Sequence, residues 1–463
     1  MDGSQPIDPY LSGNFAPVRS EDSFELKVTG AFPRDLAGSL YRNGPNPQFD
    51  PGGDYHWFSG DGMIHAFHVE GGRVRYANRY IRTPKWCDEN AAGRRLFGGM
   101  GNPMDNDPSV AGHDSGVANT NTLWHAGRLL ALEEAHAPFE MDPRSLASVG
   151  YRDFGGKVTA HPKIDPETGE MVFFGYAVGT QPLSNIVSYG VADSAGALVR
   201  RDDFTAPYCS MIHDFMVTRE HVLFPVLPLT GSLERVMRGG PAFAWEPDKG
   251  AFVGVMARKA GVDTIRWFNT GANYVFHVMN AWDEGDKIFA DVMQYETAPL
   301  FPNADGARSA ERASARLARW TFDLAAGSDV IKREYIDDMP GEFPRFDERR
   351  AGLSYRHGWF AGQDERPGAI RAASIAHIDL ATGKRSVWSL PPGDAVSEPV
   401  FVPRSDGADE GDGWLVAVAY RAQEDRSDMV VLEALDVTAG PIAIAQMPRR
   451  VPFGFHGNWR PGA

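Results

Sequence analysis

The sequence has little cysteine, a deficit of basic residues and no long hydrophobic run, and each shortage excludes a class of protein. Two cysteines, Cys87 and Cys209, in 463 residues allow one disulfide at most, which fits a reducing compartment. Lys and Arg number 46 against 61 Asp and Glu, so the formal net charge is −15. Nucleic acids and anionic membranes attract basic patches, so we expect neither as a partner.

Targeting and cofactor signals are also missing. Residues Met1–Ser20 are polar, without the basic region and apolar core of a signal peptide. The longest apolar run, Val222–Leu229, is interrupted by prolines and is far shorter than the roughly 20 residues that span a bilayer. We therefore predict a soluble, cytoplasmic protein without a membrane span. No Gly-x-Gly-x-x-Gly fingerprint lies between a strand and a helix, which argues against nicotinamide and flavin cofactors.

Glycine and proline are abundant instead, with 50 and 33 residues, and they separate short apolar or alternating runs of strand length. Three related turns, Asp165–Gly169, Asp379–Gly383 and Asp436–Gly440, begin with Asp and end with Gly. Asp can bond the local backbone in such turns, and Gly accepts a positive φ. A strand–turn–strand unit that recurs along a chain is typical of a β-propeller, so we predict an all-β fold.

Few segments show helical periodicity. The best candidates are Ala307–Arg316 and Ser232–Arg238, with one further turn within Arg19–Val28. We expect the excursions between strands to form a cap. A chain of 463 residues would suggest about three domains, but no linker supports that division. We therefore predict one domain over residues 1–463, with residues 1–35 as an arm that wraps the propeller.

The stretch Met211–Pro225 is predicted to form two short strands joined by a turn, with His213 at the head of the first. A single histidine beside apolar neighbours more often caps a turn or fills a core than binds a ligand. Three more histidines, His161, His277 and His456, share this setting. Four imidazoles that met at one point would hold a transition metal, because neutral imidazole suits iron, copper, zinc and nickel.

The spacing of these four histidines fits a ring of blades. The intervals between them along the chain are 52, 64 and 179 residues. The first two are about one blade each, at roughly 40–50 residues plus insertions. The last spans several blades and returns the end of the chain to the axis. Ligands so far apart need a fold that collects them at one centre, as a propeller axis does.

Several motifs together resemble the carotenoid cleavage oxygenase family nearly from end to end. They are Tyr41-Arg-Asn-Gly-Pro-Asn-Pro47, Trp57-Phe-Ser-Gly-Asp-Gly-Met63, Ala118-Asn-Thr120, Ala131-Leu-Glu-Glu134, His161-Pro-Lys163, Met211-Ile-His-Asp214, Gly341-Glu-Phe-Pro-Arg345, Glu398-Pro-Val-Phe-Val402 and Phe455-His-Gly457. Two others, Arg82-Thr-Pro-Lys-Trp86 and Phe97-Gly-Gly-Met-Gly-Asn-Pro103, resemble the bacterial branch that cleaves lignin-derived stilbenes and propenyl phenols.

The resemblance implies a seven-bladed β-propeller with Fe(II) on its axis, beneath a cap of loops and short helices. Four family histidines that bind the iron match His161, His213, His277 and His456. An octahedral iron with four histidine ligands keeps two positions open, and one of them can bind O2.

Four further positions match family residues around the metal. Three glutamates match Glu134, Glu342 and Glu398, and a ligating imidazole usually donates its second N–H to such a carboxylate. Thr120 matches a family residue whose methyl group approaches the coordination position of the iron that lies on the same side.

The substrate-binding positions depart from the stilbene-cleaving branch. That branch holds the substrate's phenol with an aromatic residue, a Tyr and a Lys, which match Phe58, Met100 and Glu133 here. The pair that ionises the phenol is therefore missing, because Met100 offers an adaptable apolar wall and an anionic Glu133 would repel a phenolate. Glu133 could accept a hydrogen bond from a neutral phenol, or point to solvent.

The residues support three hypotheses. The leading one is a non-haem Fe(II) dioxygenase that cleaves the alkene of a lignin-derived stilbene or phenylpropenoid with O2 into two carbonyl products. The second is an apocarotenoid cleavage oxygenase or an isomerase with the same four-histidine site. The third is a binding module with structural histidines, which would purify without stoichiometric iron. For the enzyme, the expected partners are a small aromatic alkene and O2, and a homodimer is left open.

Overall fold

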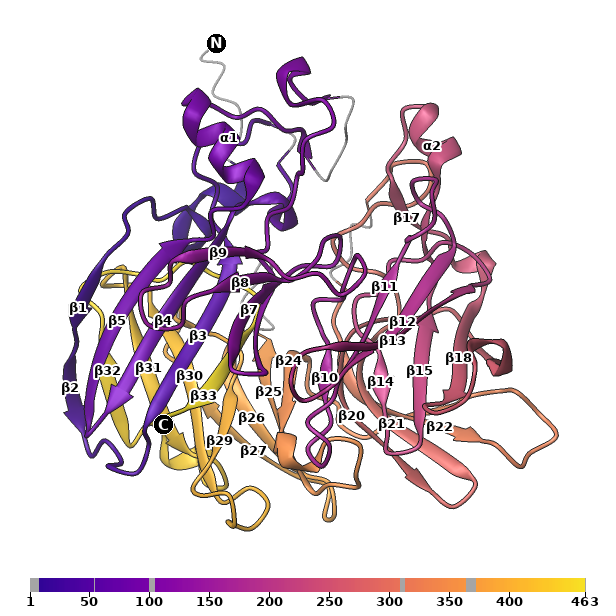
Figure 1. Cartoon of the computed structure of the whole chain (residues 1–463). Coiled ribbons are helices and arrows are strands. Elements are labelled where there is room, and N and C mark those ends of the chain that lie inside the picture. The colour runs from indigo at the N-terminus through magenta and orange to yellow at the C-terminus, as the bar shows by residue number, and fades with distance from the viewer. Residues whose placement is uncertain (1–7, 54, 100–104, 309–312, 364–371, 463) are drawn as a thin grey trace.

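Seven antiparallel sheets dominate the computed structural model, which describes residues 8–53, 55–99, 105–308, 313–363 and 372–462 (Figure 1). Each sheet is one blade of a propeller, and the innermost strands of most neighbouring blades contact one another around the axis. The prediction of an all-β, seven-bladed propeller is confirmed.

The strands of each blade follow one another from the axis outward. Blade 1 comprises β33 (Gly457–Pro461), β3 (Gly38–Pro45), β4 (Gly62–Glu70), β5 (Arg73–Tyr80) and β1 (Ser23–Glu25). Blade 2 comprises β6 (Asn121–His125), β7 (Arg128–Leu132), β8 (Phe139–Met141) and β9 (Ser148–Tyr151). Blade 3 comprises β10 (Lys163–Ile164), β11 (Met171–Tyr176), β12 (Ile186–Ala192) and β13 (Leu198–Thr205). Blade 4 comprises β14 (Met216–Val217), β15 (His221–Val226), β18 (Ala251–Ala257) and β19 (Arg266–Thr270).

The remaining blades follow in chain order. Blade 5 comprises β20 (Tyr274–Glu284), β21 (Lys287–Tyr295), β22 (Arg316–Asp323) and β23 (Lys332–Tyr335). Blade 6 comprises β24 (Gly341–Phe346), β25 (His357–Gln363), β26 (Ala372–Asp379) and β27 (Lys384–Ser389). Blade 7 comprises β28 (Ala395–Val396) and β29 (Val400–Pro403) at its inner edge, then β30 (Gly413–Arg421), β31 (Arg426–Glu433), β32 (Ala443–Gln446) and β2 (Lys27–Gly30).

The two ends of the chain close the ring. The C-terminal strand β33 pairs with β3, and the N-terminal strands β1 and β2 pair with β5 of blade 1 and β32 of blade 7. The predicted helical turn within Arg19–Val28 is therefore wrong, because these backbone groups complete the outer edges of two sheets. The division of the chain into domains, including the arm of residues 1–35, stays a prediction.

The hydrophobic core lies between adjacent blades. Central strands such as β30 are buried on both faces, which is why they read as continuous apolar runs. Aromatic rings bridge the interfaces between blades: Trp359 of blade 6 stacks on Phe401 of blade 7 with ring centroids 4.8 Å apart. Phe174 of blade 3 packs against Phe215, which precedes β14 of blade 4. This packing fixes the blades around the axis and so positions side chains that project into it.

Two helices and a ribbon project from the same end of the propeller, as the predicted cap requires (Figure 1). They are α1 (Pro84–Ala92) on one side and, on the other, α2 (Leu233–Met237) and the ribbon of β16 (Leu229–Gly231) and β17 (Phe243–Trp245). Short 3-10 turns occur at Pro9–Leu11, Gly13–Phe15, Trp57–Ser59, Pro108–Val110, Pro247–Lys249, Val262–Thr264, Glu348–Arg350 and Val437–Ala439. In the described part of the chain, no helix is long and apolar enough to cross a membrane.

The helix predictions have mixed outcomes. The helix expected at Ser232–Arg238 is confirmed as α2. In the segment 307–316, residues 309–312 lie outside the described residues, the described remainder is not helical, and Arg316 begins β22. Helix α1 was not predicted, although its signals are in the sequence. Thr83 caps its first turn, Pro84 follows at the first helical position, and Gly93 ends it with a φ of 69°.

Asn43 of β3 ties blade 1 to blade 2, and its removal is expected to destabilise the fold. Its Nδ2 donates to the carbonyl oxygens of Ala118 and Asn121, at 2.7 and 3.0 Å. Asn43→Ala leaves these buried acceptors short of a donor, so we expect a loss of about 2–4 kcal/mol of unfolding free energy. Urea denaturation measures it, with the exposed Asn90→Ala on α1 as control. Equal midpoints for the two variants would contradict the role of Asn43.

Candidate metal centre

The four histidines reach the propeller axis from four blades, each at the start of an innermost strand. His277 lies within β20, His161 and His213 come two and three residues before β10 and β14, and His456 immediately precedes β33. All four are buried. The expectation that His213 heads a strand is wrong by three residues. The strand begins later because the carboxylate of Asp214 accepts the N–H groups of Phe215 and Val278, at 2.8 and 2.9 Å, in place of a neighbouring strand.

The four imidazoles converge through their Nε2 atoms. Nε2 of His213 lies 3.1 Å from that of His161 and 3.2 Å from that of His277, and Nε2 of His277 lies 3.0 Å from that of His456. One nitrogen from each ring fits within a span of 4.8 Å. A metal held by imidazole at about 2.1 Å, with neighbouring bonds at right angles, separates adjacent nitrogens by about 3.0 Å. The spacing of the nitrogens therefore suits one metal ion.

Each of the three blades without a metal-facing histidine provides a glutamate. Nδ1 of His213 faces Oε1 of Glu134, which follows β7 of blade 2. Nδ1 of His277 lies 2.5 Å from Oε2 of Glu342 in β24 of blade 6. Nδ1 of His456 lies 3.0 Å from Oε1 of Glu398, between β28 and β29 of blade 7. The structure thus brings together all seven predicted residues and assigns each glutamate to one ring.

These carboxylates decide which ring nitrogen carries the proton. A carboxylate is an acceptor, so Nδ1 of each paired ring is the N–H donor and Nε2 carries a lone pair. Lone pairs that point at one another repel unless a cation lies between them. The four rings therefore fit a metal ion as their common partner. They cannot hydrogen-bond to one another instead, because no proton lies where the paired rings meet.

Burial keeps two of the rings neutral, as metal ligation requires. It holds the pKa of His161 well below its usual range and lowers that of His456 to about 4, against the opposing effect of Glu398. In His277, burial also lowers the pKa, but the carboxylate of Glu342 outweighs it and the pKa is raised.

Two of these glutamates are themselves supported from other blades, whereas Oε2 of Glu342 accepts the N–H of the adjacent Phe343 at 2.6 Å. Oε2 of Glu134 accepts the hydroxyl proton of Tyr176 at 2.6 Å. Burial, reinforced by Glu134, raises the pKa of Tyr176 well above its usual range, so the phenol stays a donor. Oε2 of Glu398 accepts the N–H of Gly457 at 2.9 Å, and Arg345 lies 3.5 Å from its Oε1. No local sequence signal marks Tyr176, because its partner is in another blade.

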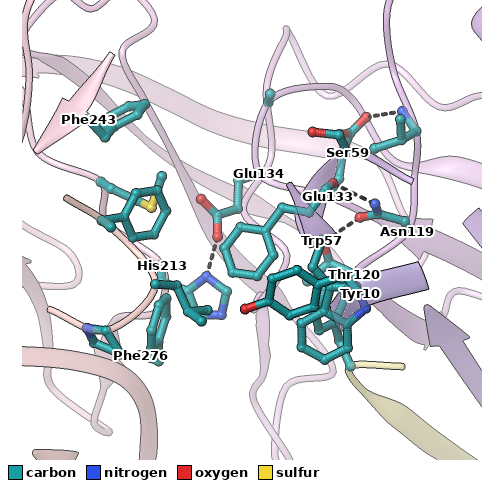
Figure 2. A pocket seen from close by; sticks show the side chains of 18 of the residues that line it. Tyr10, Trp57, Ser59, Asn119, Thr120, Glu133, Glu134, His213, Phe243 and Phe276 are labelled. Atoms are coloured by element: carbon teal, nitrogen blue, oxygen red, sulfur yellow. Dashed lines mark hydrogen bonds and ion pairs between the residues drawn. The ribbon is translucent and has the colours of Figure 1, made fainter. Parts of the chain in front are cut away.

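A cavity of about 720 Å³ opens on one side of the histidines. Its walls are largely aromatic, and Phe58 packs edge-to-face against Phe276, Phe301 and Phe455. Figure 2 shows Trp57 and Tyr10 beside Thr120 on one wall, with His213 and Glu134 facing them across the cavity. Such a site suits a flat, apolar ligand with few polar groups.

The whole chain resembles known oxygenases. Residues 15–461 match the family model described as retinal pigment epithelial membrane protein, RPE65. Isoeugenol monooxygenase of Pseudomonas nitroreducens is 40% identical, over 98% of this chain and 98% of that protein. Lignostilbene-alpha,beta-dioxygenase isozyme III of Sphingomonas paucimobilis is 38% identical, over 98% and 97%. The crystal structure of Pseudomonas brassicacearum lignostilbene dioxygenase superposes with a TM-score of 0.95 and 36% identity, over 99% of both chains.

The chain belongs to the RPE65/carotenoid cleavage oxygenase family. Its four-histidine centre is of the type that this family uses for Fe(II). The resemblance first seen in scattered motifs is thereby confirmed over the full propeller.

Within this oxygenase fold, Thr120 occupies the place that a histidine takes in other blades. It immediately precedes β6, the innermost strand of blade 2, and it lines the cavity. Its carbonyl oxygen accepts the N–H of His456 at 3.1 Å, and its hydroxyl donates to Oδ1 of Asn119 at 3.1 Å. The main-chain carbonyl and the hydroxyl of Thr120 are thus both engaged by neighbours, and the hydroxyl bond restrains the side chain beside the four histidines.

The structure describes two of the three predicted substrate contacts. Phe58 and Glu133 line the cavity of this oxygenase, whereas Met100 lies outside the described residues. In Figure 2, Glu134 points toward His213 and the carboxylate of Glu133 points away from it. The alternation expected of neighbouring residues at a strand end therefore directs one carboxylate to the metal ligands and the other elsewhere on the cavity wall.

Proposed function

We propose that this protein is a non-haem Fe(II) dioxygenase that cleaves the alkene of a small aromatic substrate. The observation that carries the proposal is a ring of four inward imidazole nitrogens, three of them set by carboxylates, beside an aromatic-lined cavity. The relatives named for isoeugenol and lignostilbene support a propenyl phenol or a stilbene as the substrate class.

The protein's own residues have distinct roles in this proposal. His161, His213, His277 and His456 would hold Fe(II), which when bound activates O2 at its open positions. Glu134, Glu342 and Glu398 keep the Nδ1 protons outward and so orient the rings. Phe58 and the neighbouring rings hold the aromatic group and exclude water. Thr120, which lines the cavity, would narrow the approach to the iron.

The reaction balances without a further redox partner. The carbon–carbon double bond breaks, each carbon gains one oxygen atom from O2, and two carbonyl products form. This stoichiometry requires no reductant, in agreement with the lack of a nicotinamide or flavin fingerprint. We propose a cytoplasmic location, since neither Cys87 nor Cys209 forms a disulfide.

The test is iron loading under anaerobic conditions, followed by a product assay with stilbenes, propenyl phenols and apocarotenals. We expect two carbonyl products per turnover from an aromatic alkene, dependent on stoichiometric iron. Preferred cleavage of apocarotenals would move the substrate to the apocarotenoid class. A protein that purifies without binding iron and cleaves none of these alkenes would instead be a scaffold, and the proposal would be wrong.

Isotope labelling separates a dioxygenase from a monooxygenase, since the names of the relatives include both. With ¹⁸O2 in ordinary water, we expect the label in both carbonyl products. The products are reduced to alcohols immediately, because aldehyde oxygen exchanges with water, and the reciprocal experiment in H2¹⁸O measures that exchange. Label in one product only would contradict the dioxygenase stoichiometry while retaining alkene cleavage.

A further inference from the structure

Phe343, beside the metal centre, has a backbone conformation that a bulky residue rarely adopts. Its φ is 56°, in the left-handed region, where a large side chain is strained. The next residue is Pro344, and a residue before proline otherwise favours an extended conformation. Strain of this kind persists only where the surrounding structure imposes it, and it gathers at functional sites. The conformation of Phe343 therefore points to a function for the position of its ring.

A β-bulge in blade 6 produces this conformation. Glu342 of β24 pairs with Ala361 of β25. The next pair is Arg345 with Trp359, so two residues of β24 lie opposite one residue of β25. Oε2 of Glu342 accepts the N–H of Phe343, which gives the bulged residue a local partner. A bulge redirects a side chain, and the ring of Phe343 forms part of the cavity wall.

The ring of Phe343 lies against two of the metal-facing histidines. It stacks on His277 with ring centroids 5.3 Å apart and an interplanar angle of 28°. It meets the ring of His456 edge-to-face at 5.2 Å. The Nε2 atoms of these two histidines are 3.0 Å apart, so one phenyl ring contacts two neighbouring ligands. Neither imidazole can tilt far toward Phe343 without displacing that ring.

The carboxylate that orients His277 is also shielded from water. Oε1 of Glu342 is buried and has no hydrogen-bond partner among the described residues. A charged oxygen in this state would bind water if water could reach it. The apolar groups around a metal site control solvent access and the local dielectric, and Phe343 is the apolar residue adjacent to Glu342. A low dielectric in turn strengthens the hydrogen bond between His277 and Glu342.

We propose that Phe343 is a positioning residue that slows metal release, because its ring restrains His277 and His456 and excludes water from them. The inference rests on the metal centre of the proposed function and adds a residue that controls how fast the metal leaves. A metal leaves such a site as water replaces its ligands one at a time. The phenyl ring opposes this exchange at two ligands, since it restricts both the tilt of each imidazole and the approach of water.

The test is the rate at which protein loaded with Fe(II) without oxygen, or with Co(II), releases its metal to excess chelator. Phe343→Gly removes the ring and also the strain, since glycine accepts a positive φ. We expect this variant to fold and to release either metal about tenfold faster than the wild type. Phe343→Leu keeps an apolar side chain and is expected to release metal within about threefold of the wild-type rate.

Phe301→Ala is the matched control, because Phe301 lines the same cavity but its ring packs against His56 and Phe58. We expect this variant to alter substrate affinity and to release metal at the wild-type rate. The visible absorption of bound Co(II) provides a second readout, since it reports the ligands of the ion rather than the stability of the fold. We expect the spectrum to change in Phe343→Gly and to match the wild type in Phe301→Ala.

Equal release rates in the wild type and a folded Phe343→Gly would overturn the inference. Equal acceleration in Phe301→Ala would also overturn it, since opening the cavity would then explain the result. If Phe343→Gly does not fold, Phe343→Asn takes its place with the same expectation, because asparagine tolerates the left-handed region. Both metals report without an alkene, so faster release from a variant of a protein that cleaves no alkene would support the inference and overturn only the proposed reaction. A chain that binds neither metal would overturn both.

Discussion

Replacement of any one of His161, His213, His277 or His456 by alanine is expected to remove most of the bound iron and nearly all alkene-cleaving activity. The nitrogens of neighbouring rings lie 3.0–3.2 Å apart around one point, so each would provide one bond to an iron held between them. Its loss leaves an incomplete donor set and, for three of the four, a glutamate without its imidazole partner. Both changes disfavour metal binding.

Metal content and turnover measure this result. Iron per chain is determined by elemental analysis after anaerobic loading, and kcat/KM is measured with the best substrate of the panel. His221→Ala is the control, since His221 lies in β15 of the same blade as His213 but pairs with Asp283 away from the axis. Full iron content in two of the four alanine variants would contradict the assignment of the ligands.

Glu342→Gln and Glu398→Gln are expected to retain the fold and to lower metal affinity or activity by about 10–100-fold. An amide can present its NH2 group to Nδ1, and the ring then loses the acceptor that fixes its tautomer. The larger loss is expected at Glu398. Although burial opposes ionisation, Arg345 and His456 lower the pKa of Glu398 to about 2, so the amide removes a charge that both neighbours use.

Iron affinity by competition with a chelator, together with kcat/KM, measures the effect of these carboxylates. Glu433→Gln on β31 is the matched control, because Glu433 lies in the same blade as Glu398 and pairs with the exposed Arg404. Wild-type affinity and rates in both the Glu342 and Glu398 variants would show that neither carboxylate orients a ligand.

The sequence by itself determined the fold class and the identity of the residues at the axis. Strands buried on both faces leave continuous apolar runs, such as Trp414–Tyr420, and glycine-ended turns separate them, so a repeated β architecture is visible without coordinates. Local sequence patterns predicted the wrong secondary structure where pairing with distant strands decides the conformation. Within Arg19–Val28, residues pair into β1 and β2 because β5 and β32 supply their backbone partners, and these strands are distant in the sequence.

Only the tertiary structure decided how the site is assembled. The pairs His213–Glu134, His277–Glu342 and His456–Glu398 join residues 79, 65 and 58 positions apart, and each pair crosses between blades. Periodicity fixes which face of a strand a residue occupies, but the rotation between blades decides which side chains meet at the axis. For the same reason the sequence did not reveal the hydrogen bond from the hydroxyl of Tyr176 to Glu134, which also joins two blades.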